Sequence, residues 1–71
     1  MVDIRKLREA IDSSGITIVF IAEKAGMSRE TLYNRLKGKG EFTASEITSL
    51  TDILHLSKAE RDDIFLRSEL N

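Results

Sequence analysis

The feature that most constrains this fold is a glycine, Gly26, set between two short apolar stripes in residues 17–39. Glycine adopts positive φ readily, so it can end one helix in a tight turn, and the hydroxyl of Ser28 can cap the next helix. Apolar side chains recur at helical spacing on both sides of the turn: Ile21, Ala22 and Ala25 before it, Leu32 and Leu36 after it. The pattern therefore predicts two short helices joined by a tight turn.

Length and composition indicate one small domain over residues 1–71. The chain has 71 residues and no cysteine, so neither disulfides nor thiolate-bound metal can reinforce its core. No apolar run approaches the roughly 18 residues of a membrane span, and the N-terminus lacks the apolar stretch of a secretory signal peptide. We therefore expect a cytoplasmic protein that does not contact the membrane.

Capping residues and glycines divide the chain into five expected helices. Two capping boxes, in which a hydroxyl and a glutamate three residues later cap each other's backbone amides, begin at Thr43 and Ser57. Gly15 fits the left-handed position that ends a first helix. The expected helices run over about 2–13, 17–25 and 28–37, followed by one from about 43 and one from about 57. The predicted fold class is all-α.

Charge is distributed unevenly, although the formal net charge is only −1. Residues 24–40 carry five basic side chains and one acidic one, a net charge of +4, whereas residues 41–71 carry three basic and seven acidic ones, a net charge of −4. A basic segment on an otherwise acidic molecule orients it toward a polyanion and keeps the far side away. The small net charge alone argues against nucleic-acid binding, but this distribution favours it.

The residues of this basic segment also carry a resemblance. The segment IAEKAGMSRETLYNRLKGKGEF resembles the helix-turn-helix of the phage repressor/Cro (Xre-type) regulators, and the later segment HLSKAERDDIF resembles small regulators from Gram-positive prophages. The resemblance extends from about Leu7 to Phe65. It implies a five-helix, lambda-repressor-like domain that binds double-stranded operator DNA as a homodimer, in some cases only on the DNA, with its third helix in the major groove.

The resemblance also implies which residues of the third helix meet DNA. Arg29 can bond guanine O6 and N7, and Asn34 can bond adenine N6 and N7. For every such residue, solvated surface is the competing interpretation. The residues expected to contact bases are Arg29, Glu30, Thr31 and Asn34, and those expected to contact phosphates are Ser28, Tyr33, Lys37 and Lys39.

The chain departs from the family pattern where the second helix begins. Polar residues are usual there, but this sequence has Ile18, Val19 and Phe20. One interpretation is that Val19 and Phe20 pack on the first helix or the chain end, and the other is that the three residues contact a partner protein. The end of the chain also holds more apolar residues than one helix face needs, so a candidate protein interface comprises Ile18, Val19, Phe20, Phe65 and Leu66, with Leu70 beyond them.

These features favour one function over two alternatives. The leading hypothesis is a sequence-specific transcriptional regulator, and the runner-up is an antirepressor-like modulator that engages a larger repressor protein through its apolar second helix. An antitoxin is a weaker third hypothesis. The lone histidine, His55, has no companion ligands at metal-binding spacing, and no nucleophile–base pair or phosphate-cradling loop is present. We therefore expect no enzyme activity, no metal and no cofactor.

Overall fold

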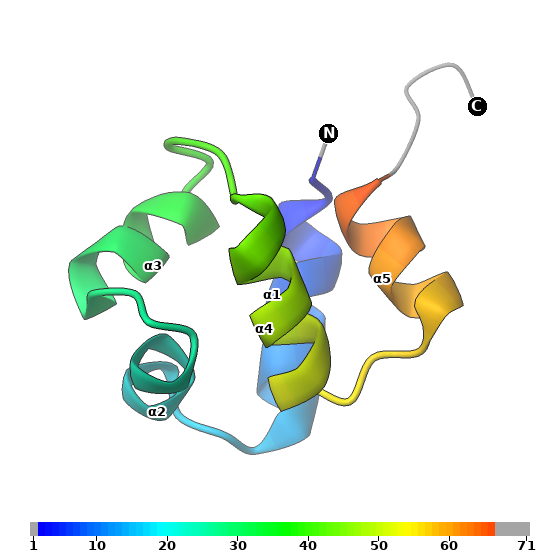
Figure 1. Ribbon diagram of the computed structural model, residues 1–71, viewed down its shortest axis with the longest axis horizontal. Coiled ribbons are helices and arrows are strands. Elements are labelled where there is room, and N and C mark those ends of the chain that lie inside the picture. Colours follow the sequence, from blue (N-terminus) through cyan, green and yellow to red (C-terminus); the bar gives the residue numbers. More distant parts are fainter. Residues whose placement is uncertain (1, 67–71) are drawn as a thin grey trace.

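Side-chain caps and tight turns organise the chain into a bundle of short helices. The computed structural model describes residues 2–66, and within them there are five helices, which confirms the predicted all-α class (Figure 1). The helices are α1 (Ile4–Ser14), α2 (Ile18–Lys24), α3 (Arg29–Leu36), α4 (Ala44–Ile53) and α5 (Lys58–Phe65).

Every helix begins at a residue whose side chain accepts a hydrogen bond from the first turn. Both predicted capping boxes are present, at Thr43 with Glu46 and at Ser57 with Glu60. The first helix starts at Ile4 instead of Val2, because the Asp3 carboxylate accepts from the Lys6 amide at 3.1 Å. A short polar side chain in this position offers the first turn a partner that the backbone lacks.

The predicted turn after α2 is closed by two backbone hydrogen bonds. Gly26 has a φ of 70°, its amide donates to the Glu23 carbonyl at 3.2 Å, and the Met27 amide donates to the Ala22 carbonyl at 2.9 Å. This is the glycine-based ending that satisfies the last carbonyls of a helix. His55 takes the same role after α4 with a φ of 54°, the only non-glycine residue with positive φ among residues 2–66.

The core lies where the five helices meet. Leu7, Ile21, Leu32 and Leu50 contribute one side chain each from α1 to α4, and all four are completely buried. Helix α1 packs against α3 and α5, and α2 packs against α3 and α4. In Figure 1, α2 and α3 lie on one side of the molecule and α5 on the other, with α1 and α4 between them. The arrangement leaves α3 at the edge of the bundle.

Two residues at the end of α5 are both buried, which corrects one part of the sequence analysis. Phe65 is 3% exposed and Ile64 is 5% exposed, so Phe65 belongs to the core and is not available to a protein interface. Its ring meets that of Phe42 edge-on, with the centroids 5.6 Å apart. Leu66 is 60% exposed and remains a surface residue, while Leu70 lies outside the described residues.

Candidate nucleic-acid interface

One face of α3 projects a row of polar side chains away from the core. Arg29, Glu30, Tyr33, Asn34 and Lys37 are all exposed, and they recur at intervals of three and four residues. Residues at this spacing lie on one side of a helix. The structure therefore places five of the predicted contact residues on a single surface: four lie within α3, and Lys37 is the residue that ends it.

Ser28 and Thr31 are engaged with each other at the start of this helix. The Ser28 hydroxyl accepts from the Thr31 amide at 3.0 Å and donates to the Thr31 hydroxyl at 2.8 Å. Thr31 is half-buried, whereas Ser28 is exposed. The cap therefore occupies the hydroxyl hydrogen of Ser28 and leaves that of Thr31 to donate elsewhere. For Ser28 to make its predicted phosphate contact, its hydroxyl hydrogen must turn from Thr31 to the phosphate.

The opposite face of α3 is anchored in the core and at its C-terminal end. Leu32 is completely buried and Leu36 is 3% exposed. The guanidinium of Arg8 in α1 donates twice to the Leu36 carbonyl, from Nε at 3.2 Å and from Nη2 at 3.0 Å. A cation at this position donates to a carbonyl that has no partner within the helix, and its charge interacts favourably with the negative end of the helix dipole. The two anchors fix the direction in which the exposed face points.

Arg35 is the basic residue of α3 that does not join the exposed face. It forms an ion pair with Glu46 at the start of α4, and each side chain is only 17% exposed. Partial burial opposes the charged form of Glu46, yet the hydrogen bond from the Thr43 amide and the Arg35 guanidinium outweigh it and lower the pKa of this carboxyl from its ordinary value of 4.5. The pair links the end of α3 to the start of α4.

The lowered pKa of Glu46 predicts a loss of stability in acid. A carboxyl whose pKa is lower in the folded chain contributes stability above its unfolded pKa, near 4.5, and loses it as the pH falls through the folded value. The free energy of unfolding of Glu46→Gln should therefore change less between pH 5 and pH 3 than that of the wild type. Urea titrations across this range measure it. Glu60→Gln should flatten the profile as well, because the hydrogen bonds of the Ser57 cap lower the pKa of that carboxyl. A Glu46→Gln profile as steep as that of the wild type would contradict the prediction.

The turn after α3 presents two further predicted contact residues. The Lys39 amide donates to the Asn34 carbonyl at 2.9 Å and the Gly38 amide to the Arg35 carbonyl at 3.0 Å, so the backbone is held by the end of the helix. The side chains of Lys37 and Lys39 are exposed. They extend the α3 surface into the following loop.

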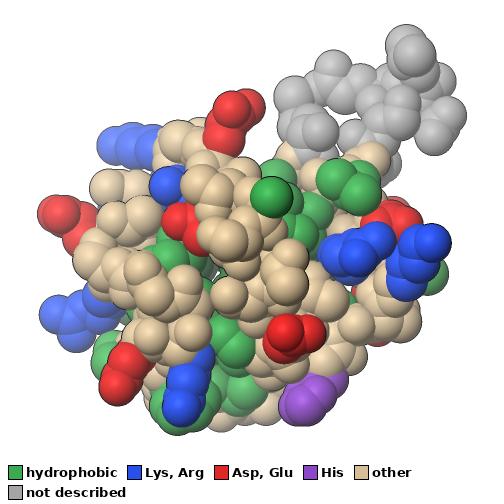
Figure 2. Space-filling view, viewed as in Figure 1, with side chains coloured by type: hydrophobic (Ala, Val, Ile, Leu, Met, Phe, Trp, Pro, Cys, Tyr) green, Lys and Arg blue, Asp and Glu red, His purple; other side chains and the backbone are tan. Residues whose placement is uncertain are grey.

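The basic surface is less continuous than the charge of residues 24–40 suggests. Figure 2 shows blue Lys and Arg side chains on the α3 side separated by red Asp and Glu side chains. One of the five basic residues of that segment, Arg35, is neutralised by Glu46 from outside it. Arg29, Lys37 and Lys39 remain exposed around α3.

The apolar start of α2 divides between the core and the surface. Ile18 is partly buried against the core, whereas Val19 is 50% exposed and Phe20 is 46% exposed. The Lys24 ammonium lies 5.4 Å from the centre of the Phe20 ring. The interpretation that Val19 and Phe20 pack on the first helix is therefore wrong, because a short helix can turn only one side toward the core. The chain end beyond residue 66 lies outside the described residues.

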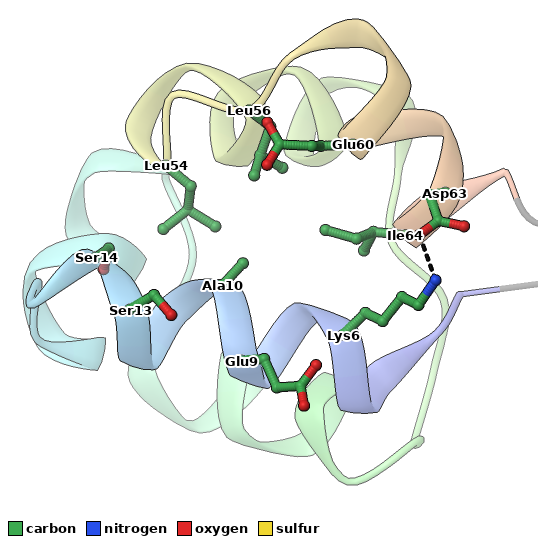
Figure 3. A pocket seen from close by; sticks show the side chains of 10 residues that line it. All are labelled: Lys6, Glu9, Ala10, Ser13, Ser14, Leu54, Leu56, Glu60, Asp63 and Ile64. Carbon is green, nitrogen blue, oxygen red and sulfur yellow. Dashed lines mark hydrogen bonds and ion pairs between the residues drawn. The ribbon is translucent and has the colours of Figure 1, made fainter.

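A groove elsewhere on the molecule contains none of the predicted site residues. It has a volume of about 390 Å³ and lies between α1 and the α4–α5 region (Figure 3). Its apolar residues are Ala10, Leu54, Leu56 and Ile64, and Lys6 forms an ion pair with Asp63 at its edge. In residues 2–66 no helix is long and apolar enough to cross a membrane. The same residues contain no group of three or more possible metal ligands.

Sequence reasoning missed two contacts that orient α3. Arg8 and Leu36 are 28 residues apart, and Arg35 and Glu46 are 11 residues apart. Neither pair falls within a helical repeat, so no local pattern indicates it. The capping box at Thr43 identified Glu46 as a cap, but it gave no sign of the arginine that shares the carboxylate.

Comparison with known proteins agrees with this geometry. A family model described as helix-turn-helix matches residues 4–61, which covers most of the chain and all of α1 to α4. No curated protein and no solved structure matches the chain.

Proposed function

The chain belongs to the phage repressor/Xre family of helix-turn-helix DNA-binding regulators, and from that premise we propose that it is a Cro- or repressor-like protein that places α3 in the major groove of an operator. Residues at the start of a recognition helix meet base edges in this mode of binding. Arg29, Glu30 and Asn34 are the base-contacting residues, together with Thr31. Bound in this way, the protein would act in the cytoplasm by occupying the operator.

The observation that carries the proposal is the exposed polar face of α3 on a helix anchored from behind. An α-helix with its side chains is about 10–12 Å across, which matches the width of about 12 Å of the major groove. The Arg29 guanidinium can donate to guanine O6 and N7, and the Asn34 amide can donate to adenine N7 and accept from adenine N6. Tyr33, Lys37 and Lys39 flank them, and with Ser28 they are the proposed phosphate contacts.

A homodimer on a two-fold site follows from the small size of this face. One helix of this length reads only a few base pairs, and proteins of this architecture bind two half-sites about one helical turn apart. We propose that two copies of the chain occupy the operator together. The exposed Leu66 is available to such a contact, whereas Phe65 is buried.

Selection from a random duplex pool tests the proposal. We expect the wild type to enrich a two-fold site, with affinity that falls steeply between about 0.05 M and about 0.2 M salt. Arg29→Ala should weaken binding to that site by about 1–3 kcal/mol and relax the preference at one base pair of each half-site. Fluorescence anisotropy titrations measure both effects.

A matched substitution on the far side of the molecule controls for lost charge. Arg61→Ala removes an arginine of α5, which lies across the bundle from α3 (Figure 1) and pairs with Asp62 of the same helix. It should change the affinity less than about threefold, because salt screens a charge on that side from DNA bound at α3. Equal losses in Arg29→Ala and Arg61→Ala would contradict α3 as the recognition helix. Enrichment of no sequence would contradict the operator.

The exposure of Val19 and Phe20 favours a second candidate function. In it, the protein modulates a larger repressor by contacting it through the surface of α2. The selection experiment separates the two functions, because a modulator of this kind enriches no operator by itself. Phe20→Ser should then abolish binding to the repressor while leaving any DNA binding unchanged.

A further inference from the structure

Arg35 lies under the loop that joins α3 to α4. A Cβ atom built on Gly40 would be 3.1 Å from Nε of Arg35 and 3.5 Å from its Cδ. The arginine side chain therefore passes directly beneath the backbone of the loop. Gly40 has a φ of 81°, so both its conformation and its contact with Arg35 disfavour a larger residue.

The guanidinium of Arg35 then connects the loop to the two helices that follow. It lies 5.6 Å from the centre of the Phe42 ring, which contacts Phe65 of α5 edge-on. It also forms the ion pair with Glu46 in the first turn of α4. One side chain thus contacts the loop at Gly40, its end at Phe42 and the helix beyond it.

One carboxylate oxygen of Glu46 accepts hydrogen bonds from two residues. This atom, Oε1, accepts from the Thr43 amide at 2.9 Å and from Nη1 of Arg35. The capping box at Ser57 and Glu60 has the same hydrogen bonds to its own backbone, and no arginine is paired with Glu60 among residues 2–66. Capping therefore does not require the arginine, and the Arg35–Glu46 pair has a role besides starting α4.

We propose that the Arg35–Glu46 pair positions the loop of residues 37–42 so that Lys37 and Lys39 reach DNA phosphates, while Arg35 itself contacts no DNA. This inference rests on the proposed function, in which Lys37 and Lys39 bind phosphates. Both lysines are exposed. Hydrogen bonds to the end of α3 hold the backbone of residues 37–39, whereas Gly40 and Phe42 of the same loop lie against the Arg35 side chain. Arg35 and Glu46 are positioning residues, because they act through the lysines.

Salt dependence of DNA binding distinguishes positioning from direct contact. The slope of log affinity against log salt reports about 0.9 per phosphate neutralised. If the pair positions the loop, Arg35→Gln and Glu46→Gln should each reduce the magnitude of this slope by about 1–2. The double variant should reduce the slope no further than either single variant, because each substitution already breaks the same ion pair. Glutamine at position 46 can still accept from the Thr43 amide, so the cap is retained.

Glu60→Gln is the matched control, because it removes one negative charge from the equivalent capping box. Glu60→Gln should leave the salt slope unchanged. Arg35→Lys keeps the positive charge but should still reduce the slope in part, since an ammonium lacks the planar, two-pronged hydrogen-bonding geometry of a guanidinium. Amide hydrogen exchange of Gly38 and Lys39 in the free protein should accelerate in Glu46→Gln and not in Glu60→Gln. Thermal unfolding confirms that each variant is folded.

Three results would overturn the inference in distinguishable ways. If Glu46→Gln binds DNA more tightly than Glu60→Gln, Arg35 is a phosphate contact that Glu46 restrains. If both glutamate variants behave alike in binding and exchange, the pair only caps α4, and the proposed function stands without it. If the wild type shows no salt-dependent binding at all, the proposed function is wrong and the positioning role fails with it.

Discussion

Replacing Leu32 with alanine is expected to lower the free energy of unfolding by about 2–5 kcal/mol. Leu32 is completely buried where α3 meets the core, so alanine leaves a cavity that the surrounding helices can fill only in part. A domain of this size is stabilised by about 4–10 kcal/mol in total. The substitution should therefore bring the chain close to unfolding at ordinary temperature, as measured by urea denaturation followed by circular dichroism.

The same substitution at an exposed leucine shows how much of the loss of stability comes from the buried cavity and how much from shortening a leucine side chain. Leu66 is 60% exposed, and Leu66→Ala should change the free energy of unfolding by less than about 0.5 kcal/mol. A loss at position 32 no larger than the loss at position 66 would mean that α3 is not packed as described. In that case the exposed face of α3 would have no fixed direction either.

Enlarging Ala22 to leucine is expected to lower the free energy of unfolding by about 1–3 kcal/mol. Ala22 is 2% exposed on α2, a helix that packs against both α3 and α4. The added atoms have no open space to enter, so α2 has to shift away from its neighbours or strain their side chains. Thermal and urea unfolding of the variant measure the loss.

An exposed alanine is the control for the size of this change. Ala59 lies in the first turn of α5 and is exposed, so Ala59→Leu should be neutral within about 0.5 kcal/mol. If Ala22→Leu were equally neutral, the contact of α2 with α3 would be loose. The tight turn at Gly26 would then be a connection between two mobile helices and not a rigid joint.

The two core predictions bear on function because the same residues direct α3. Leu32 and Ala22 hold the back of the helix, Arg8 holds its C-terminal carbonyl, and Arg35 supports the loop after it. A recognition surface must keep its donors within a fraction of an ångström of the bases they bind. Loss of DNA binding in a core variant therefore needs a comparison with its unfolding before it is assigned to a contact.

The order and the starts of the helices could be predicted from local sequence. Caps at Thr17, Ser28, Thr43 and Ser57 act within three residues, and the turn at Gly26 depends on the backbone of one residue, so both are visible in the sequence. The apolar spacing likewise identified Ile21, Leu32 and Leu36 as core residues. Asp3 was missed as a cap although it follows the same rule.

The sequence by itself determined this local framework, because capping, glycine turns and helical spacing are interactions between near neighbours. Only the tertiary structure decided that Val19 and Phe20 are exposed, that Phe65 is buried, and that Arg35 turns inward to Glu46. Those outcomes depend on which side of a short helix its neighbours cover. They also depend on partners 11 to 28 residues away, and no periodic pattern of a single helix encodes such distances.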